Sequence, residues 1–215
     1  ANAWFVGEPF KVFYDYKKEG IWQLGEEAAA AANGQEPGDI KVQDVDGNGV
    51  ITTDDRIIYS QRPDVTFGFN NTFNYKGFDL SVFLYARLGQ WIAYDYNTTY
   101  RINALENGGN VDYWTPENPT NAFPRPNKSK SYTQVTYYST LKYEDGSFFK
   151  IRDITLGYTF KPELLKHLNL SRLRVYATAK NFFTFSKIDN YDPEQGGSIS
   201  FPMTKQLVFG LNVEF

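Results

Sequence analysis

Long segments in which apolar and polar residues alternate one by one limit the fold of this sequence more than any other feature. Such alternation is typical of a β-strand with one apolar and one polar face. One segment covers residues 65–75 and another covers 78–88, and Lys76-Gly77 between them is a tight-turn signal. The two segments therefore predict a β-hairpin. Its apolar positions are Val65, Phe67, Phe69, Phe73, Tyr75, Phe78, Leu80, Val82, Leu84, Ala86 and Leu88.

Four further segments read as strands in the same way. Three of them are long and cover residues 153–160, 173–185 and 207–215. A shorter one covers Phe10 to Tyr16, which makes six predicted strands in all. The alternation changes phase between Lys150 and Asp153, and we expect a β-bulge there.

The lengths of the strands and of their connections favour a membrane barrel. Strands of soluble proteins are commonly about 5–6 residues long, whereas strands that cross a membrane need about 9–11. Two connections, at residues 76–77 and 161–171, are short, and three, at 18–64, 92–147 and 187–204, are long. Short turns at one end and long loops at the other are typical of outer-membrane barrels. We therefore predict an all-β fold, namely a segment of an antiparallel transmembrane β-barrel with long extracellular loops.

Composition narrows the alternatives. Aromatic residues make up 18% of the chain while the mean hydropathy is only −0.49, so apolar residues are interspersed rather than gathered in blocks. A net charge of −3 gives no basic surface for nucleic acid, and the absence of cysteine excludes disulfides and thiolate metal sites. Since six strands are fewer than the roughly 8 of the smallest membrane barrels, the chain is expected to pair with strands outside it. Alternation alone also fits a secreted, calcium-stabilised β-sandwich that binds carbohydrate, and this alternative stays open.

One motif predicts a metal site. Asp44, Asp46 and Asn48 stand at the first, third and fifth positions of an EF-hand-like loop, and Gly49 follows at the sharp turn. The remaining calcium ligands would be the Val50 carbonyl, Thr52 and Asp55. The last of these replaces the usual Glu with a shorter side chain. The alternative is a plain double turn, because Asp-Gly and Asn-Gly are turn signals in any context.

No catalytic constellation is visible, and we predict that the chain is not an enzyme. His167 is the only histidine and lies in a predicted turn. The loop aromatics Tyr94, Tyr96, Tyr100, Tyr113 and Trp114 would either stack on substrate or pack the loop itself, and packing is favoured for Tyr113-Trp114. The polar-face cations Arg87, Arg174 and Lys180 would either contact substrate or balance Asp79, Asp153 and Glu214.

Ten stretches resemble the C-terminal barrel region of the SusC/RagA-type TonB-dependent transporters. They include Tyr75-Lys76-Gly77-Phe78-Asp79-Leu80-Ser81, Asp145-Gly146-Ser147-Phe148-Phe149 and Tyr191-Asp192-Pro193-Glu194, occur in the family's order and span nearly the whole chain. The others lie at residues 6–10, 20–23, 37–41, 44–49, 113–121, 153–158 and 181–185.

The resemblance implies a barrel of roughly 22 strands with a plugged lumen, in the outer membrane of a Gram-negative bacterium. It implies that the whole protein imports glycans or oligopeptides with energy from TonB. Expected partners are the rest of the barrel, the plug domain, a SusD-like surface lipoprotein, TonB and membrane lipid. We expect one structural unit over residues 1–215, with the structural calcium loop at 44–55 on the extracellular side.

Overall fold

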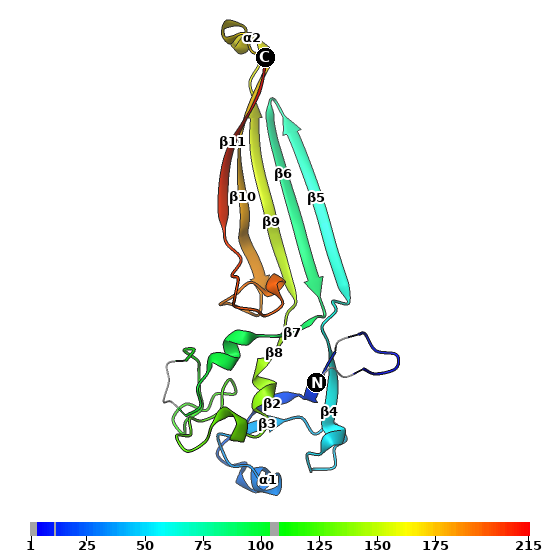
Figure 1. Ribbon diagram of the computed structural model, residues 1–215, viewed down its shortest axis with the longest axis vertical. Coiled ribbons are helices and arrows are strands. Elements are labelled where there is room, and N and C mark those ends of the chain that lie inside the picture. The colour runs from blue at the N-terminus through cyan, green and yellow to red at the C-terminus, as the bar shows by residue number, and fades with distance from the viewer. Residues whose placement is uncertain (1–3, 11, 104–107) are drawn as a thin grey trace. The chain divides into compact units, whose positions relative to one another are not determined.

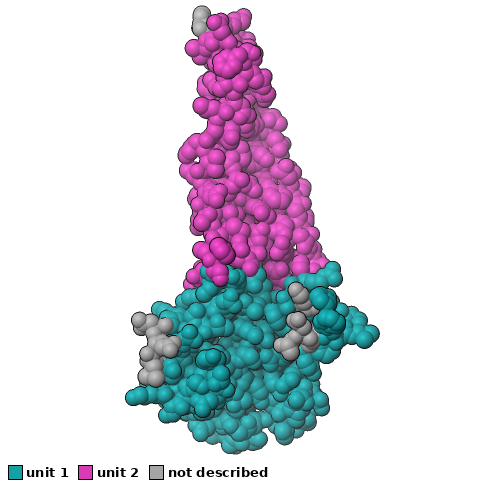
Figure 2. Space-filling view, viewed as in Figure 1, with its two compact units in different colours: residues 1–62, 91–145, 196–199 teal, residues 63–90, 146–195, 200–215 magenta. Residues whose placement is uncertain are grey.

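The computed structural model describes residues 4–10, 12–103 and 108–215. The chain forms two compact units, each assembled from separate stretches of sequence. Unit 1 contains residues 1–62, 91–145 and 196–199, and unit 2 contains residues 63–90, 146–195 and 200–215 (Figure 2).

Unit 2 is built around one five-stranded antiparallel sheet with the strand order β11-β10-β9-β6-β5 (Figure 1). Its strands have 9 to 15 residues, which is the length that the alternation predicts for membrane-crossing strands. The five described strands form an open sheet with β11 and β5 at its edges. The strands are β5 (Val65–Tyr75), β6 (Phe78–Leu88), β9 (Phe148–Thr159), β10 (Arg172–Ser186) and β11 (Gln206–Glu214).

The predicted hairpin is confirmed. Strands β5 and β6 pair without interruption from Val65 opposite Leu88 to Tyr75 opposite Phe78. The φ angles of Lys76 and Gly77 are 48° and 91°, and two positive values are what a two-residue hairpin turn of type I′ requires. A Cβ on Gly77 would lie 2.8 Å from the Thr159 carbonyl oxygen of strand β9, so glycine is needed for space as well as for conformation.

The predicted β-bulge is also confirmed and is centred on Arg152. On one side of β9, the register with β6 moves from Phe83 to Leu84 while β9 skips Arg152. On the other side, Asn181 and Phe182 of β10 stand opposite the same residue. Asn181 adopts a positive φ of 57° at this point, as residues of a bulge commonly do.

The two faces of the sheet differ in chemistry along its whole length. Because β-strand side chains alternate between faces, the register places the apolar positions of all five strands on one face. Many of these side chains are exposed, for example Phe73 at 59%, Phe209 at 74% and Leu211 at 68%. The opposite face, which we call the polar face, carries Thr, Asn, Asp, Arg and Lys side chains.

The sixth predicted strand does not belong to this sheet. Strand β1 (Val12–Tyr16) pairs with β4 (Arg56–Ser60) in a separate two-stranded sheet of unit 1. With five residues, β1 is too short to match its long counterparts, and the partner strand β4 was not predicted. The prediction of about six strands in one sheet is therefore wrong by one strand.

Unit 1 consists of short elements around a small core. Its other strand pairs are β2 (Lys18–Ile21) with β3 (Ile40–Val42) and β7 (Trp91–Ala93) with β8 (Tyr143–Asp145). The alanine run forms helix α1 (Glu27–Ala32). The unit also has the 3-10 helices η1 (Thr53–Asp55), η2 (Asp95–Thr99), η3 (Tyr132–Gln134) and η4 (Tyr138–Lys142). Its core consists of Ile21, Ile40, Val42, Trp114 and Leu141.

The connections of unit 2 differ in length at the two ends of the sheet. At one end lie the β5–β6 turn and the β9–β10 connection, which contains α2 (Pro162–Leu165) and η5 (Lys166–Leu168) (Figure 1). At the other end, the β10–β11 connection contains η6 (Pro193–Gln195). In the described part of the chain, no helix is long and apolar enough to cross a bilayer.

Candidate functional site

The polar face of the sheet carries ion pairs between its strands, and the first of them reaches across β9, which lies between β10 and β6. Arg174 on β10 binds Asp79 on β6 through two hydrogen bonds, of 2.8 Å from Nε and 2.5 Å from Nη2. Lys180 lies 3.7 Å from Asp153, which is a weaker and more exposed contact. Both acids are the partners that the sequence suggested. By contrast, Glu214 pairs with Arg172 at 3.3 Å rather than with any of the three predicted cations.

Arg87 belongs to the same face but has a different partner. Its Nε donates a hydrogen bond of 2.7 Å to the Tyr85 hydroxyl, and its guanidinium lies 5.5 Å from the centre of that ring. The side chain is thus held along its own strand.

A charge quartet, formed by Lys150, Arg152, Asp192 and Glu194, is the best-buried polar cluster of unit 2. The Lys150 side chain is 0% exposed, and its Nζ lies 2.6 Å from Asp192 Oδ2 and 2.8 Å from Glu194 Oε2. Arg152, at the bulge, reaches the other oxygen of Glu194 at 3.0 Å. The Thr184 hydroxyl donates to Asp192 at 3.4 Å. Two cations and two carboxylates meet, so the quartet is electrically balanced.

Sequence reasoning missed this quartet. From the sequence, Lys150 was only one end of the phase change and had no predicted partner, and Asp192 and Glu194 appeared only as part of a family-like motif. The available signal was the phase change at the bulge together with two acids separated by one residue. Lys150 contacts both acids, and Arg152 at the bulge contacts Glu194.

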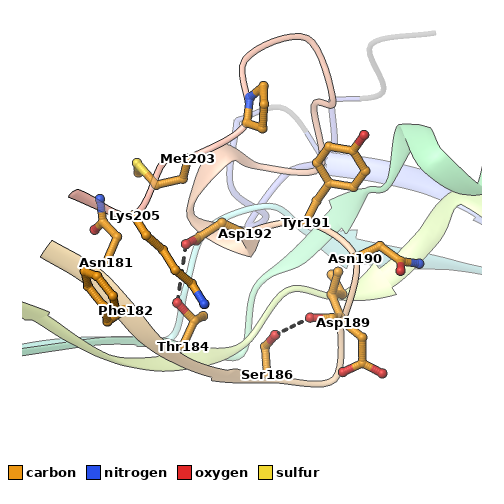
Figure 3. Close-up of a pocket in the computed structure, with 12 residues that line it drawn as sticks. Asn181, Phe182, Thr184, Ser186, Asp189, Asn190, Tyr191, Asp192, Met203 and Lys205 are labelled. Atoms are coloured by element: carbon orange, nitrogen blue, oxygen red, sulfur yellow. Dashed lines mark hydrogen bonds between the residues drawn. The ribbon is translucent and has the colours of Figure 1, made fainter. Parts of the chain in front are cut away.

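A cleft of about 470 Å³ lies beside the quartet, between the end of β10 and two segments of the β10–β11 connection (Figure 3). Residues 188–192 form one wall, and Pro202, Met203 and Lys205 form another. The Thr184–Asp192 contact and a hydrogen bond of 2.8 Å from the Ser186 hydroxyl to the Ile188 carbonyl join the first wall to β10. The cleft contains both hydrogen-bonding side chains and the ring of Phe182.

The predicted calcium loop brings its three carboxylates together. Oxygen atoms of Asp44, Asp46 and Asp55 lie within 4.8 Å of one another. The carboxylate of Asp44 accepts the N–H groups of Gly47 and Gly49, at 2.8 and 2.7 Å, which folds the loop inward. Gly49 has a φ of 85°, in agreement with the sharp turn expected there. The donor set is entirely oxygen, which is the chemistry that calcium prefers.

The Asp55 side chain links the two ends of this loop through hydrogen bonds. The residue is fully buried, and its two oxygens accept the N–H groups of Val45 and Thr52 at 2.7 Å each. These donors, that of Thr52 above all, hold the pKa of the Asp55 carboxyl below its ordinary value. Asp55 therefore keeps its negative charge at the position where the twelfth ligand is expected.

Two of the other three predicted ligands, Asn48 and Thr52, make side-chain hydrogen bonds within the loop. Asn48 donates its amide nitrogen to Asp46 at 2.7 Å and accepts the Val50 N–H at 2.8 Å with its oxygen. The Thr52 hydroxyl accepts the Asp54 N–H at 3.2 Å and so caps η1. The structure places Val50 in the loop with an exposed side chain. The carboxylates of Asp44, Asp46 and Asp55 thus converge, while the Asn48 and Thr52 side chains take part in hydrogen bonds of the loop.

The loop aromatics of unit 1 mostly pack the unit itself. Trp114 is buried in the core and donates its Nε1–H to Gln23 at 2.8 Å, as favoured from the sequence. Tyr94 and Tyr100 are buried as well, and the Tyr100 hydroxyl donates to the Pro124 carbonyl. Tyr113 is 43% exposed, and Tyr96 stacks on Tyr94 with ring centres 5.9 Å apart.

Comparison with known proteins gives relatives of much greater length. The chain is 31% identical to TonB-dependent receptor P3 of Formosa agariphila over 97% of this chain and 22% of the receptor. It is also 31% identical to TonB-dependent receptor SusC of Bacteroides thetaiotaomicron over 80% of this chain and 17% of that receptor. No family model matches the sequence. The chain thus spans about a fifth of the length of these curated relatives.

Among solved structures, the fold matches a chain from the structure of the RagAB peptide transporter. The TM-score is 0.72 at 24% identity, and the match covers 99% of this chain and 24% of that chain. These proteins are named as receptors or as a transporter, in agreement with the prediction of a non-enzymatic family. Over about 97% of its length the chain is therefore homologous to the SusC/RagA-type TonB-dependent receptors of the outer membrane, of which it covers about a fifth.

Proposed function

We propose that the chain is the C-terminal barrel part of an outer-membrane importer that takes up bulky nutrients, glycans or oligopeptides, with energy from TonB. The observation that carries this proposal is the apolar face of unit 2. It runs along five strands of 9 to 15 residues and stays exposed at Phe73, Phe209 and Leu211. Contiguous exposed apolar surface of this extent marks an interaction surface, and lipid fits its length and continuity.

The β-sandwich alternative is less well supported. A sandwich needs a second sheet packed against the apolar face of the first. In the part of the chain that the structure describes, the other sheets have only two strands each, and the apolar side chains of unit 2 remain exposed.

The same proposal accounts for the open edges of the sheet. Strands β5 and β11 each lack a neighbour on one side within the described chain. Unpaired strand edges are not tolerated in hydrocarbon, because each unsatisfied backbone group there costs several kcal/mol. The remaining strands of a barrel of roughly 22 strands would satisfy them. A plug domain would occupy the lumen, and a SusD-like lipoprotein would cover it from outside.

Topology on intact cells tests this proposal. The protein should cross the membrane several times, with the β5–β6 turn in the periplasm and the loop around Glu117 outside. Because this chain has no native cysteine, a single cysteine can be placed at either position. A membrane-impermeant maleimide should label Glu117→Cys on intact cells and Lys76→Cys only after permeabilisation. Labelling in the reverse order would exclude the proposed orientation.

We further propose that the loop at residues 44–55 binds a structural calcium ion through Asp44, Asp46 and Asp55. Asn48, Val50 and Thr52 would complete the site after local rearrangement. Support comes from the EF-hand-like spacing and from the convergence of the three carboxylates within 4.8 Å.

Calcium titration of the full-length receptor tests this assignment by calorimetry. The Asp44→Asn/Asp46→Asn variant should lose one calcium-binding event that the matched Asp54→Asn variant retains. Asp54 lies in the same segment but has no place in the motif. Equal calcium stoichiometry in the two variants would argue against the site.

A further inference from the structure

The end of strand β10 has one unpaired edge. Strand β11 pairs with β10 only from Arg172 to Lys180, whereas β9 pairs with β10 up to Ser186. Residues 181–186, which we call the overhang, therefore have a strand neighbour on the β9 side alone. In the segment that leads into β11, the Thr204 carbonyl accepts a hydrogen bond of 3.2 Å from the Asn181 amide.

Backbone groups of the overhang remain available on its open side. In an antiparallel β-strand, each residue directs its N–H and C=O groups to the same neighbouring strand, so beyond the bulge at Asn181 and Phe182 every second residue of the overhang points away from β9. Among the described residues, no backbone–backbone hydrogen bond outside the strands involves residues 181–186. These donors and acceptors repeat at about 6.8 Å, which is the two-residue spacing of an extended peptide.

The cleft described above lies along this open edge. Asn181, Phe182, Thr184 and Ser186 of the overhang line it, and Met203 and Lys205 stand on the β11 side (Figure 3). Its volume of about 470 Å³ lies within the range of roughly 300–1,000 Å³ that is usual for ligand sites. The space beside the edge is therefore large enough to admit a ligand main chain.

The charge quartet fixes the shape of this cleft. Asp192 lies in the wall formed by residues 188–192, and the buried Lys150 holds it at 2.6 Å. Because the quartet is electrically balanced, it offers no net charge to a ligand. The two charges left in the cleft are those of Asp189 and Lys205, which are exposed and of opposite sign. A largely neutral ligand with backbone amides fits this arrangement better than a strongly charged one.

We propose that the overhang binds an extended peptide segment as an added strand within this cleft. Addition of a peptide to a free strand edge gives affinity through main-chain hydrogen bonds and tolerates many side chains. The four regular residues of the overhang beyond the bulge, 183–186, would accommodate about 13 Å of extended chain. A glycan has no alternating N–H and C=O groups to match the edge. The proposal rests on the proposed import function and assigns peptides as the substrate class.

Photo-crosslinking on the full-length receptor in detergent tests the site. The probe is a mixture of alanine-rich heptapeptides that carry a central benzophenone group. Mass spectrometry should find crosslinks in residues 181–192 and 200–205. Met203→Trp, which fills the cleft, should reduce crosslinking at least tenfold. The matched control Leu207→Trp places the same side chain on the apolar face and should leave crosslinking unchanged.

Two further crosslinking experiments use the unaltered receptor, so their results do not depend on how a variant folds. A probe with N-methylated backbone amides should lose most of its crosslinking, because it cannot pair with a strand. Maltoheptaose in excess should not compete. Crosslinks elsewhere in the receptor, an N-methylated probe that binds equally well, or full competition by maltoheptaose would each overturn the proposal.

Uptake of the same peptides by cells with and without TonB separates this inference from the proposed function. Import without crosslinks in the cleft would refute the site and keep the importer. Crosslinks in the cleft without TonB-dependent uptake would support the site and refute import of peptides by this protein.

Discussion

Replacement of Lys150 by Met should release the wall of the cleft from strand β9. Met keeps much of the length of the side chain but removes the ammonium that faces two carboxylates at 2.6 and 2.8 Å. Glu194 would keep Arg152 at 3.0 Å. Asp192 would keep only the Thr184 hydroxyl at 3.4 Å and the Glu194 backbone N–H at 3.0 Å. One carboxylate would therefore stay largely buried without a cation.

The magnitude follows from the burial of the pair. Breaking a buried ion pair by removing one partner costs about 3–5 kcal/mol. The Asp192 side chain is 13% exposed, and water can reach it when the segment shifts, so we expect the lower end of this range. A loss of about 3 kcal/mol corresponds to roughly a 100-fold increase in the population of the open segment.

Hydrogen exchange on the full-length receptor measures this opening directly. The amides of Glu194 and Gln195 donate to Asp192 in the closed state and report on its position. Lys180→Met is the matched control, because Lys180 lies on the same face in an ion pair of 3.7 Å and is 46% exposed. An exposed pair of this kind contributes about 0–1 kcal/mol, so exchange should rise at most about fivefold.

A double variant tests the physical cause. Adding Asp192→Asn to Lys150→Met removes the unpaired charge while the Glu194–Arg152 pair stays intact. Protection of residues 192–195 should then recover in part, which is non-additive behaviour typical of residues in contact. Two outcomes would contradict this account. In the first, the amides of residues 192–195 exchange no faster in Lys150→Met than in Lys180→Met. In the second, they exchange faster in the double variant than in Lys150→Met alone.

The remaining predictions concern the sheet and unit 1. Leu211→Arg should destabilise the assembled barrel, by about 2–4 kcal/mol if the residue lies at the bilayer midplane, whereas Asn212→Arg on the polar face should be tolerated. Heat-modifiable gel migration measures the assembled fraction of both variants, and equal effects would contradict a lipid-facing surface. Gly77→Ala should lower the yield of assembled protein, because its Cβ would meet the Thr159 carbonyl at 2.8 Å, while Lys76→Gly in the same turn should not. The pKa of Glu26 is lowered first by the Gln23 N–H and then by Lys41, so its stabilising contribution is present at neutral pH and is lost as the pH falls through this depressed value. Glu26→Gln should therefore speed proteolysis of the segment around α1 at neutral pH, while well below that pKa both proteins should be cleaved at the same rate. A difference in cleavage rate that stays the same at every pH would contradict this account.

Most of the large sheet could be predicted from the sequence, because its cause is local. Period-two alternation marks each long strand, and the pair of positive-φ turn residues Lys76-Gly77 fixes the hairpin register. The phase change near Lys150 located the bulge for the same reason. Strand β1 was assigned to the wrong sheet because alternation describes the faces of a strand and carries no information about its partner.

The candidate sites also differ in whether their contacts are local in sequence, and this decides which of them could be predicted. The three carboxylates of the predicted calcium loop converge because they lie within one twelve-residue segment, 44–55, whose spacing the sequence alone shows. The quartet joins Lys150 to residues 42 and 44 positions later, and such a contact depends on tertiary packing. The overhang was equally invisible, because it arises from the difference in length between two neighbouring strands.

The pairing of β6 with β9, which we call the seam, has a consequence for how this protein folds and tolerates insertions. Strands β5 and β6 form one local hairpin, and β9, β10 and β11 form a local meander, while residues 89–147 separate the two blocks in the chain. A hairpin forms within about 1–10 μs, so each block is available long before the seam closes. Each doubling of the intervening loop adds only about 0.6 kcal/mol to the entropy of closure. We therefore expect that insertions or deletions between β6 and β9 leave the register of the five-stranded sheet unchanged.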